Sequence, residues 1–231
     1  LLNQAVANGW RHAYAQLTTQ GRMHNEIAAF PSLYFYSERL LPANKWQSDR
    51  WEHPFPTSQD IFSQIVAKQR TAFFSTEKLP PASRSSKTNE NEADIVVSLI
   101  RAIQNRYVSN QDQFKAADIG IITPYRNQIA LIKHQLIQTD ILGVENIMVD
   151  TVERFQGSQR EIIIVSFCIN KPYQLNFLSN LNDSGTVDRK LNVTLTRARK
   201  QLFLIGNAAI LKRNSIYATL LEHYKENMII I

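Results

Sequence analysis

Two segments of the chain place arginine in patterns that could bind phosphate. Residues 20–24 read Q-G-R-M-H and are followed by F-P-S at residues 30–32, and residues 188–199 read D-R-K-L-N-V-T-L-T-R-A-R. A guanidinium group is planar and permanently charged, and it can hold a phosphate through two parallel hydrogen bonds. Taken singly, Arg22 could equally be a surface arginine, His24 a capping or core histidine, and residues 188–199 a basic helix with one solvated face. Residue type alone leaves both interpretations open.

A third segment ends an apolar run in polar residues. Residues 119–128 read I-G-I-I-T-P-Y-R-N-Q, so Pro124 ends the expected strand and leaves Thr123 at its carboxyl end. Open α/β sheets bind ligands at the carboxyl ends of their strands. The alternative is a strand-to-helix turn in which Pro124 starts the helix and nothing binds.

A fourth segment, residues 149–157, reads V-D-T-V-E-R-F-Q-G and precedes another aliphatic run. Asp150 at the end of an apolar run could be mistaken for a metal-binding Walker B carboxylate. No second carboxylate follows it directly, so we reject that interpretation and expect no metal site. A glycine between two strands, here Gly157, lets the backbone come close to a ligand.

Together these segments resemble the motifs of superfamily 1 helicases, in the group with the nonsense-mediated-decay helicases, the Sen-type helicases and the DNA helicase-nucleases. Residues 20–24 resemble the family's Q-Y-R-M-H, which has F-P-S downstream, and residues 122–128 resemble I-T-P-Y-x-x-Q. Residues 149–157 resemble motif V, and residues 188–199 resemble R-x-N-V-A-L-T-R-A-R of motif VI, with Thr194 where the family often has alanine. The segments occur in the family's order and cover most of the chain.

The resemblance implies catalytic roles for two arginines. Arg22 and Arg197 would reach the γ-phosphate of ATP held by a neighbouring domain. Arginine fingers of this kind contribute about 10³ to 10⁵ in the rate of phosphoryl transfer. Arg199 is the lesser candidate, because two residues from Arg197 it should face elsewhere on a helix.

The resemblance also implies that Gln20, Gly157 and Gln159 contact the nucleotide. Gln159 stands where the family usually has glutamate, although an amide can still hydrogen-bond a hydroxyl group. Gly21 replaces a tyrosine that stacks on adenine in the family. Either a nearby aromatic residue such as Tyr14 substitutes for it, or the parent protein discriminates weakly between bases.

The remaining motif residues would contact a single strand of nucleic acid, and we favour DNA over RNA. By resemblance these residues are Thr123, Pro124, Tyr125, Asp150 and Thr151. Contacts to the sugar-phosphate backbone position a strand without reading its sequence.

Apolar runs of strand length alternate with amphipathic helical stretches along the chain. This pattern predicts an α/β fold with a mostly parallel sheet and helices on both faces, and the resemblance makes it RecA-like. One expected helix covers residues 91–107 and buries Val96, Leu99, Ile100, Ile103 and Tyr107, and a second buries Ile129, Ile132, Leu136 and Ile137. The expected strands are residues 14–17, 71–74, 119–123, 147–149, 162–167 and 202–205.

Composition is that of an ordinary folded protein with a mild basic bias. The 231 residues include 26 Lys and Arg against 20 Asp and Glu, for a net charge of +6. Cys168 is the single cysteine, which excludes an intramolecular disulfide and a cysteine-rich zinc site. We expect an intracellular protein, cytoplasmic or, in a eukaryote, nuclear. The sequence has no apolar run of the length of about 20 residues that spans a bilayer, and we expect no membrane partner.

The sequence contains no G-x-x-x-x-G-K-[S/T] phosphate loop. We therefore expect residues 1–231 to form one second RecA-like domain, inactive alone, with ATP and Mg²⁺ held mainly by a first RecA-like domain of the same polypeptide. The opening Leu1 and the closing apolar run, residues 228–231, suggest a fragment of a longer chain. The full-length parent would be an ATP-dependent helicase. The alternatives are a non-enzymatic nucleic-acid-binding module and a RecA-like domain that docks a partner protein.

Overall fold

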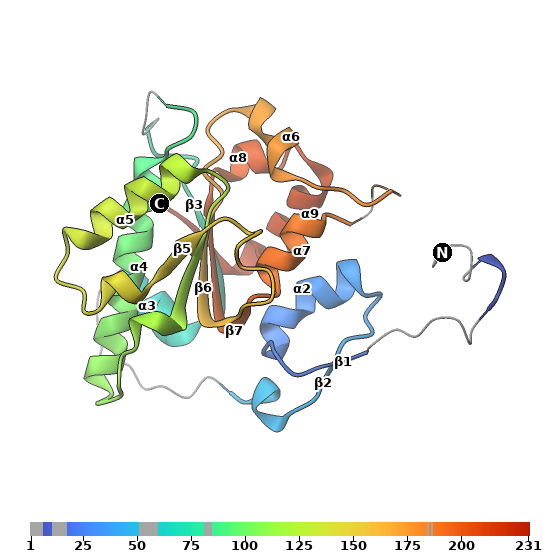
Figure 1. The fold of residues 1–231 in the computed structure, drawn as a ribbon, viewed down its shortest axis with the longest axis horizontal. Helices are drawn as coiled ribbons and strands as arrows, with labels where there is room; N and C mark the ends of the chain where they lie inside the picture. The colour runs from blue at the N-terminus through green and yellow to red at the C-terminus, as the bar shows by residue number, and fades with distance from the viewer. Residues whose placement is uncertain (1–6, 11–17, 51–59, 81–84, 184, 186) are drawn as a thin grey trace.

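The computed structural model describes residues 7–10, 18–50, 60–80, 85–183, 185 and 187–231. Its centre is a six-stranded sheet in the order β5-β4-β6-β7-β3-β8 (Figure 1). Every strand pair of this sheet is parallel, which confirms the predicted fold class. The strands are β3 (Thr71–Ser75), β4 (Ile119–Ile122), β5 (Met148–Asp150), β6 (Arg160–Ser166), β7 (Ala198–Gly206) and β8 (Met228–Ile230).

Five of these strands coincide with predicted strands to within a few residues at each end. The strand predicted at residues 14–17 lies outside the described residues. The apolar run near the carboxyl end of the chain forms β8, which the sequence analysis did not predict. β8 pairs with β3 at the edge of the sheet, and its residues Met228 and Ile229 pack against the two hydrophobic cores.

Helices cover both faces of the sheet (Figure 1). On one face lie α3 (Ile61–Lys68), α4 (Glu90–Ser109) and α5 (Arg126–Ile137). On the other face lie α2 (Asn25–Phe35), α6 (Leu175–Leu178), α7 (Arg189–Leu195), α8 (Ala208–Leu211) and α9 (Ser215–His223). A separate parallel pair, β1 (Thr19–Gln20) with β2 (Leu41–Pro42), precedes the main sheet in sequence.

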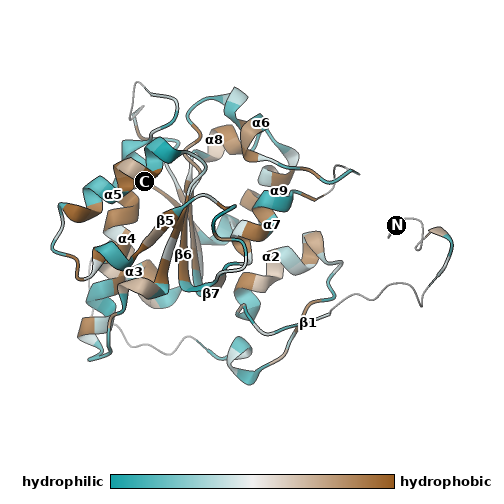
Figure 2. Cartoon of the chain, in the orientation of Figure 1, coloured by the Kyte–Doolittle hydropathy of each residue, from teal (hydrophilic) through white to brown (hydrophobic). Residues whose placement is uncertain are grey.

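Alternate residues of each strand enter two separate hydrophobic cores. In β6, Ile163 packs among the helices α2, α7 and α9, whereas Ile162 and Ile164 pack against α3, α4 and α5. Side chains of a strand point alternately to the two faces, so a sheet covered on both sides reads as a continuous apolar run. Figure 2 shows the resulting hydrophobic strands between helices whose outer surfaces are hydrophilic.

The two predicted amphipathic helices are present, with one error in their buried faces. In α4 the predicted apolar residues are buried, and Tyr107 is partly buried. In α5, Ile132 and Leu136 are buried, but Ile137 is 67% exposed. Ile137 ends the helix and follows Leu136 by one residue, so it points about 100° away from the buried face.

Short 3-10 helices complete the described part of the chain. They occupy the turns between the larger elements: η2 (Lys45–Ser48), η3 (Ala116–Asp118), η4 (Val144–Asn146), η5 (Pro172–Gln174) and η6 (Lys225–Asn227).

Candidate nucleotide and nucleic-acid sites

Arg22 and Arg197 lie together where β6 and β7 begin, at the end of the sheet that we call its amino edge. Arg22 Nε donates to Gln159 Oε1 at 3.1 Å, and its Nη1 donates to the carbonyl oxygen of Thr196 at 3.2 Å. Arg197 Nη2 donates to Thr196 Oγ1 at 3.3 Å, and its Nη1 donates to the carbonyl oxygen of Ser158 at 3.2 Å. The fold thus brings two arginines from opposite ends of the chain onto one residue, Thr196.

The two guanidinium groups repel each other. Arg197 is 9% exposed, and its pKa is lowered first by burial and then by the positive charge of Arg22. Two cations held this close, one of them desolvated, create a positive potential that an anion would relieve. The pair therefore has the electrostatic character of an anion-binding site.

Gln20 shapes the turn that carries Arg22. Its Oε1 accepts from the backbone N–H groups of Arg22 at 2.9 Å and Met23 at 2.8 Å. Its Nε2 donates to the carbonyl oxygen of Met23 at 2.9 Å. The buried Gln47 adds bonds from its Nε2 to the carbonyl oxygens of Gln20 and Met23, at 3.0 and 2.7 Å. Gln20, which was predicted to contact the nucleotide, thus uses its side-chain amide to hold this turn, and it orients Arg22.

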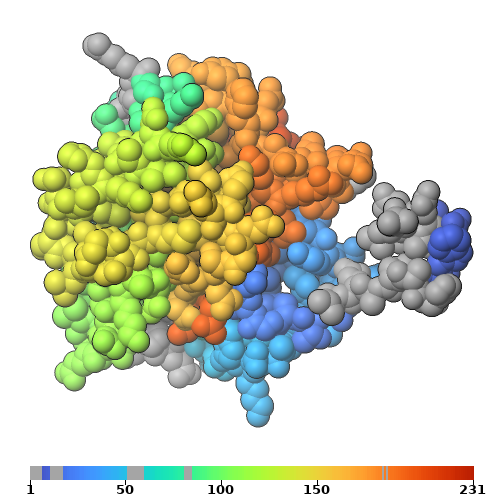
Figure 3. Space-filling view, in the orientation of Figure 1, coloured from blue at the N-terminus to red at the C-terminus, as the bar shows by residue number. Residues whose placement is uncertain are grey.

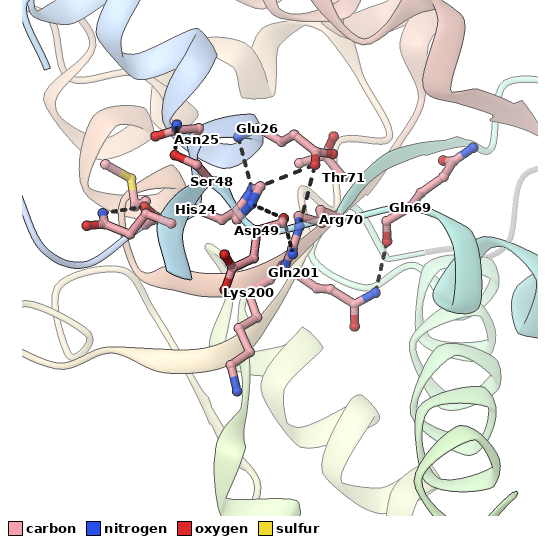
Figure 4. Close-up of polar contacts among 12 residues, drawn as sticks. His24, Asn25, Glu26, Ser48, Asp49, Gln69, Arg70, Thr71, Lys200 and Gln201 are labelled. Atoms are coloured by element: carbon pink, nitrogen blue, oxygen red, sulfur yellow. Dashed lines mark hydrogen bonds and ion pairs between the residues drawn. The ribbon is translucent and has the colours of Figure 1, made fainter. Parts of the chain in front are cut away.

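His24 caps helix α2, as one interpretation of the sequence proposed. Its Nδ1 accepts from the backbone N–H of Glu26 at 3.2 Å, and its Nε2 lies 2.9 Å from the carbonyl oxygen of Asp49 (Figure 4). Burial and the nearby Arg70 lower its pKa, so the neutral ring carries its proton on Nε2. The backbone N–H of His24 donates to the carbonyl oxygen of Arg199 at 2.9 Å and ties the Arg22 turn to β7.

Arg70 completes this polar cluster. Its Nη2 donates to the carbonyl oxygen of Asp49 at 2.9 Å, and its Nε lies 3.4 Å from Glu26 Oε1. Figure 4 shows these side chains gathered where α2, the segment after η2 and the starts of β3 and β7 meet. The cluster fixes the backbone on either side of the Arg22 turn.

Arg199 does not lie on a helix, contrary to the prediction. Helix α7 ends at Leu195, and Arg199 belongs to β7, which begins at Ala198. Its side chain forms an ion pair with Glu161 on the neighbouring strand, and its guanidinium carbon lies 5.1 Å from the centre of the Trp46 ring. Arg199 is the lesser candidate because Glu161 already holds its charge.

Gly157 lies in the exposed connection between β5 and β6. Its φ of +83° is in the left-handed region, which favours glycine, and a Cβ added there would meet no atom within 4 Å. The connection is anchored by Phe155, which is fully buried and packs on Gly120, where an added Cβ would lie 2.7 Å from the Phe155 ring. The backbone at Gly157 is therefore held in place and open to solvent.

The residues predicted to contact nucleic acid gather at the opposite, carboxyl edge of the sheet. The backbone N–H of Thr123 donates to the carbonyl oxygen of Asp150 at 3.2 Å, and Asp150 Oδ1 accepts from the backbone N–H of Thr151 at 2.8 Å. Pro124 and Tyr125 are partly exposed, but Thr123 is fully buried. Among the described residues the buried Thr123 hydroxyl has no hydrogen-bond partner. Thr123 is also one of the residues that line a cavity of about 110 Å³.

The two predicted sets of residues thus lie at opposite edges of one sheet. Gln159 and Arg197 precede β6 and β7, whereas Thr123 and Thr151 follow β4 and β5. Residues 151–159 connect the end of β5 to the start of β6 and so run from one set to the other. This segment joins the two edges along the chain, as the strands themselves also do.

A buried carboxyl group supports the carboxyl edge. Glu92, in the first turn of α4, is fully buried, and its Oε2 accepts from Ser166 Oγ at 2.7 Å and from the backbone N–H of Cys168 at 2.8 Å. Burial raises the pKa of Glu92 to about 7. The bond to Cys168 holds that residue at a φ of +49°, a strained conformation for a side chain with a Cβ.

Two buried glutamines connect Glu92 to the loop after β4. Gln128 Nε2 donates to Ser166 Oγ at 3.3 Å and to the carbonyl oxygen of Asn89 at 2.9 Å. Gln174 Nε2 donates to the Tyr125 hydroxyl at 3.1 Å. The sequence analysis missed this network, because its members are polar residues in separate segments with no shared spacing.

The sequence analysis also missed side chains that line the cavity beside Thr123. Phe177 and Lys190 line it, and Lys190 Nζ lies 3.1 Å from Glu153 Oε1. Residues 170–177, which read N-K-P-Y-Q-L-N-F and follow an apolar strand, could have indicated this surface, because they combine aromatic, basic and amide side chains.

The described residues contain no group of three or more His, Cys, Asp or Glu side chains placed to hold a metal ion. The donors at the amino edge are guanidinium and amide groups, which suit phosphate oxygens rather than Mg²⁺. Within the same described part, no helix combines the length and apolar character needed to cross a membrane.

Comparisons with known proteins agree on one family. The AAA_12 family model, described as an AAA domain, matches residues 1–209. A probable helicase of Dictyostelium discoideum is 34% identical over 93% of this chain and 20% of its own length, and regulator of nonsense transcripts 1 of the same organism is 30% identical over 95% and 16%. The DNA replication ATP-dependent helicase/nuclease DNA2 of Bos taurus is 29% identical over 96% of this chain and 21% of its own.

The chain spans about a fifth or less of the length of these curated relatives. The family model covers most of the chain, and the parallel sheet with helices on both faces has the architecture of a RecA-like domain. The chain belongs to the AAA_12 family of AAA domains and is a RecA-like domain of the superfamily 1 helicases.

Proposed function

We propose that this helicase-type motor domain is the second, C-terminal RecA-like domain of an ATP-dependent helicase. In this proposal a first RecA-like domain of the same polypeptide holds ATP and Mg²⁺, and residues 1–231 form the single domain that closes over them. The proposal rests on the convergence of Arg22 and Arg197 on Thr196. A docking module has no use for two guanidinium groups that repel each other, one of them nearly buried.

Arg22 and Arg197 would act as arginine fingers on the γ-phosphate. As the bond between the γ-phosphorus and its bridging oxygen breaks, the electron pair of that bond passes to the leaving diphosphate. Fixed guanidinium groups would stabilise the negative charge on this bridging oxygen and on the γ-phosphoryl oxygens. Gln159 holds Arg22 Nε, and the open backbone at Gly157 allows the nucleotide to come close. Mg²⁺, held on the first domain, would neutralise further charge on the phosphates.

The carboxyl edge would carry the single strand, with Thr123, Pro124, Tyr125, Asp150 and Thr151 as its contacts. Residues 151–159 would transmit closure at the nucleotide to the strand. DNA is our first choice of track ahead of RNA. One relative is named for DNA replication and another for nonsense transcripts, so both strands serve as probes.

The test is ATP turnover with single-stranded DNA or RNA present. We expect the full-length parent to hydrolyse ATP and the 231-residue chain to release no phosphate above background, because the sequence lacks a phosphate loop. Helicase-level turnover by the isolated chain, with contaminating ATPase excluded, would overturn the proposal. A parent that binds strands without hydrolysing ATP would favour the non-enzymatic alternative.

A further inference from the structure

Two large aromatic side chains stand exposed on the segment formed by η5 and α6. Tyr173 is 57% exposed and Phe177 is 68% exposed. Tyr173 belongs to η5 and Phe177 to the directly following α6, so one short helical segment carries both rings. Clustered exposed aromatic residues on a folded domain mark a surface used for binding.

The backbone that carries these rings is firmly held. Leu175 and Leu178 of the same segment are buried at 7% and 9% exposure. Gln174 Oε1 accepts from the backbone N–H groups of Asn170 and Lys171 at 2.9 and 2.8 Å, and its Nε2 donates to the carbonyl oxygen of Ser86 at 2.6 Å. The two rings are therefore presented by a rigid platform and not by a loose loop.

The platform adjoins the residues proposed to contact the strand. Gln174 bonds the Tyr125 hydroxyl, and Phe177 lines the same cavity as Thr123, Pro124 and Tyr125. Figure 3 shows the orange segment that includes α6 next to the yellow surface of α5 and the β5–β6 connection. Phe177 and the residues proposed to contact the strand thus line one hollow, and Tyr173 is carried by the same helical segment as Phe177.

The size of that hollow decides how a base could sit there. Its volume of about 110 Å³ is below the roughly 150 Å³ of an engineered cavity that holds benzene. A whole nucleobase cannot enter, so it must lie at the rim, against the exposed Phe177.

The surrounding charge suits a strand that carries phosphates between its bases. Arg126 directly follows Tyr125, and Lys171 lies two residues before Tyr173, and both basic side chains are exposed. Proteins that hold single strands combine cations for the backbone with aromatic rings for the bases.

We propose that Tyr173 and Phe177 form a stacking surface for the bases of the single strand that passes Thr123 and Thr151. This inference rests on the proposed function, because it takes the carboxyl edge as the strand track. Stacking adds affinity that does not depend on base sequence, since every base has a flat face.

The experiment compares Phe177→Ala with the unmodified chain on two strands of equal length, a thymidine homopolymer and an abasic sugar-phosphate strand. Fluorescence anisotropy gives each affinity. We expect Phe177→Ala to weaken binding to the thymidine strand roughly tenfold to a hundredfold and to leave the abasic strand unchanged. Phe177→Trp should keep the affinity. Ile137→Ala is the matched control, because Ile137 is equally exposed but lies at the end of α5.

The outcomes separate this inference from the proposed function. If the unmodified chain binds neither strand, the strand track fails. If it binds both equally and Phe177→Ala changes nothing, the track stands and the stacking surface is wrong. An equal loss on both strands would make Phe177 structural. Self-association that Phe177→Ala abolishes would assign the patch to a second copy of the chain and overturn the proposal.

Discussion

At the scale of single residues, the two candidate arginine fingers differ in what else they do. Arg22 is half-buried and bonds one side chain and one carbonyl group. Arg197 is nearly buried and bonds the carbonyl oxygens of Val193 and Ser158 as well as Thr196 Oγ1. Substitution should therefore separate catalysis from folding at Arg22 more cleanly than at Arg197.

Arg22→Lys in the full-length parent should reduce ATP turnover by a hundredfold or more, while the melting temperature changes little. Lysine keeps the positive charge but loses the planar fork that binds phosphate through two bonds. Steady-state phosphate release measures the effect, and Arg213→Lys, an exposed arginine outside the cluster, is the control. Turnover at the parental rate would make Arg22 a bystander.

Arg197→Lys should also destabilise the fold, by about 1 to 3 kcal/mol in the free energy of unfolding. The single ammonium group of lysine cannot reach the carbonyl oxygens of Val193 and Ser158 and the hydroxyl oxygen of Thr196 together. Buried oxygen atoms therefore lose a hydrogen-bond donor. Denaturant unfolding of the 231-residue chain measures this without any ATPase activity, with Arg22→Lys as the comparison. Equal stability of the two variants would contradict the assigned role of these bonds.

Glu92→Gln should change how stability depends on pH. The pKa of Glu92 is raised from 4.5 to about 7 in the fold, so the folded state holds the proton more tightly than the unfolded state. Its contribution to stability is present at acid pH and is lost as the pH rises through about 7. Relative to Glu92→Gln, the unmodified chain should lose roughly 3 kcal/mol between about pH 4.5 and pH 8.

Denaturant unfolding of both proteins across this pH range measures the difference. Groups other than Glu92 titrate in both proteins, so subtraction removes them. A difference that stays constant with pH would mean that Glu92 is ionised throughout, with its charge satisfied by Ser166 and Cys168.

At the scale of elements, the connection between β5 and β6 depends on one close contact. Phe155 packs on Gly120 of β4, and the same connection carries Gly157 and leads to Gln159. Register between β6 and β7 shifts between Arg160 and Ile162, where the connection enters the sheet. A substitution at Gly120 should therefore also displace Gly157 and Gln159, the residues of this connection that are predicted to contact the nucleotide.

Gly120→Ala should destabilise the chain by about 1 to 3 kcal/mol, because its Cβ would lie 2.7 Å from the Phe155 ring and 2.9 Å from Ile163 Cδ1. Gly21→Ala is the matched control, since its Cβ would meet only ordinary contacts at 3.5 Å and beyond. Thermal and denaturant unfolding measure both variants. If Gly120→Ala is as stable as Gly21→Ala, Phe155 does not hold the connection against β4.

At the scale of the whole molecule, the sheet separates the two candidate sites and gives each its own chemistry. The amino edge holds the paired arginines, and the carboxyl edge holds backbone groups, hydroxyl groups and aromatic rings. Each site should therefore respond to its own variants in the isolated chain, where no ATP couples them.

Strand binding by the 231-residue chain should weaken steeply with salt, by about twentyfold for a fourfold rise in salt concentration if about three phosphates are contacted. Anisotropy titrations at several salt concentrations give the slope. Arg126→Ala should make it shallower by about 0.7, the share of one phosphate on a single strand. Arg22→Lys, at the other edge, should leave it unchanged. An affinity independent of salt would contradict phosphate contacts.

The helices, the strands and the family could be predicted from the sequence alone. Apolar runs such as residues 71–74 and 162–167 predicted buried parallel strands, because a sheet covered on both faces needs apolar residues at every position. The four motifs identified the superfamily because each is a short segment at a turn or at the end of a strand, where the structure depends on residues close in sequence. Local spacing was less reliable at element ends, where Arg199 proved to be in β7 and Ile137 proved to be exposed.

Which residues contact each other could not be predicted, because it depends on how the elements pack in three dimensions. Arg22 and Gln159 are 137 residues apart, and their contact depends on the order β4-β6-β7 in the sheet and on the bond from His24 to Arg199. The parallel direction of the strands places the two sites at opposite edges, because one set of residues precedes strands and the other follows them. The hydrogen bonds around Glu92 and the exposed position of Phe177 could not be predicted from the sequence either. Residue spacing encodes a local turn or period, whereas contacts between distant segments are set by how whole elements pack.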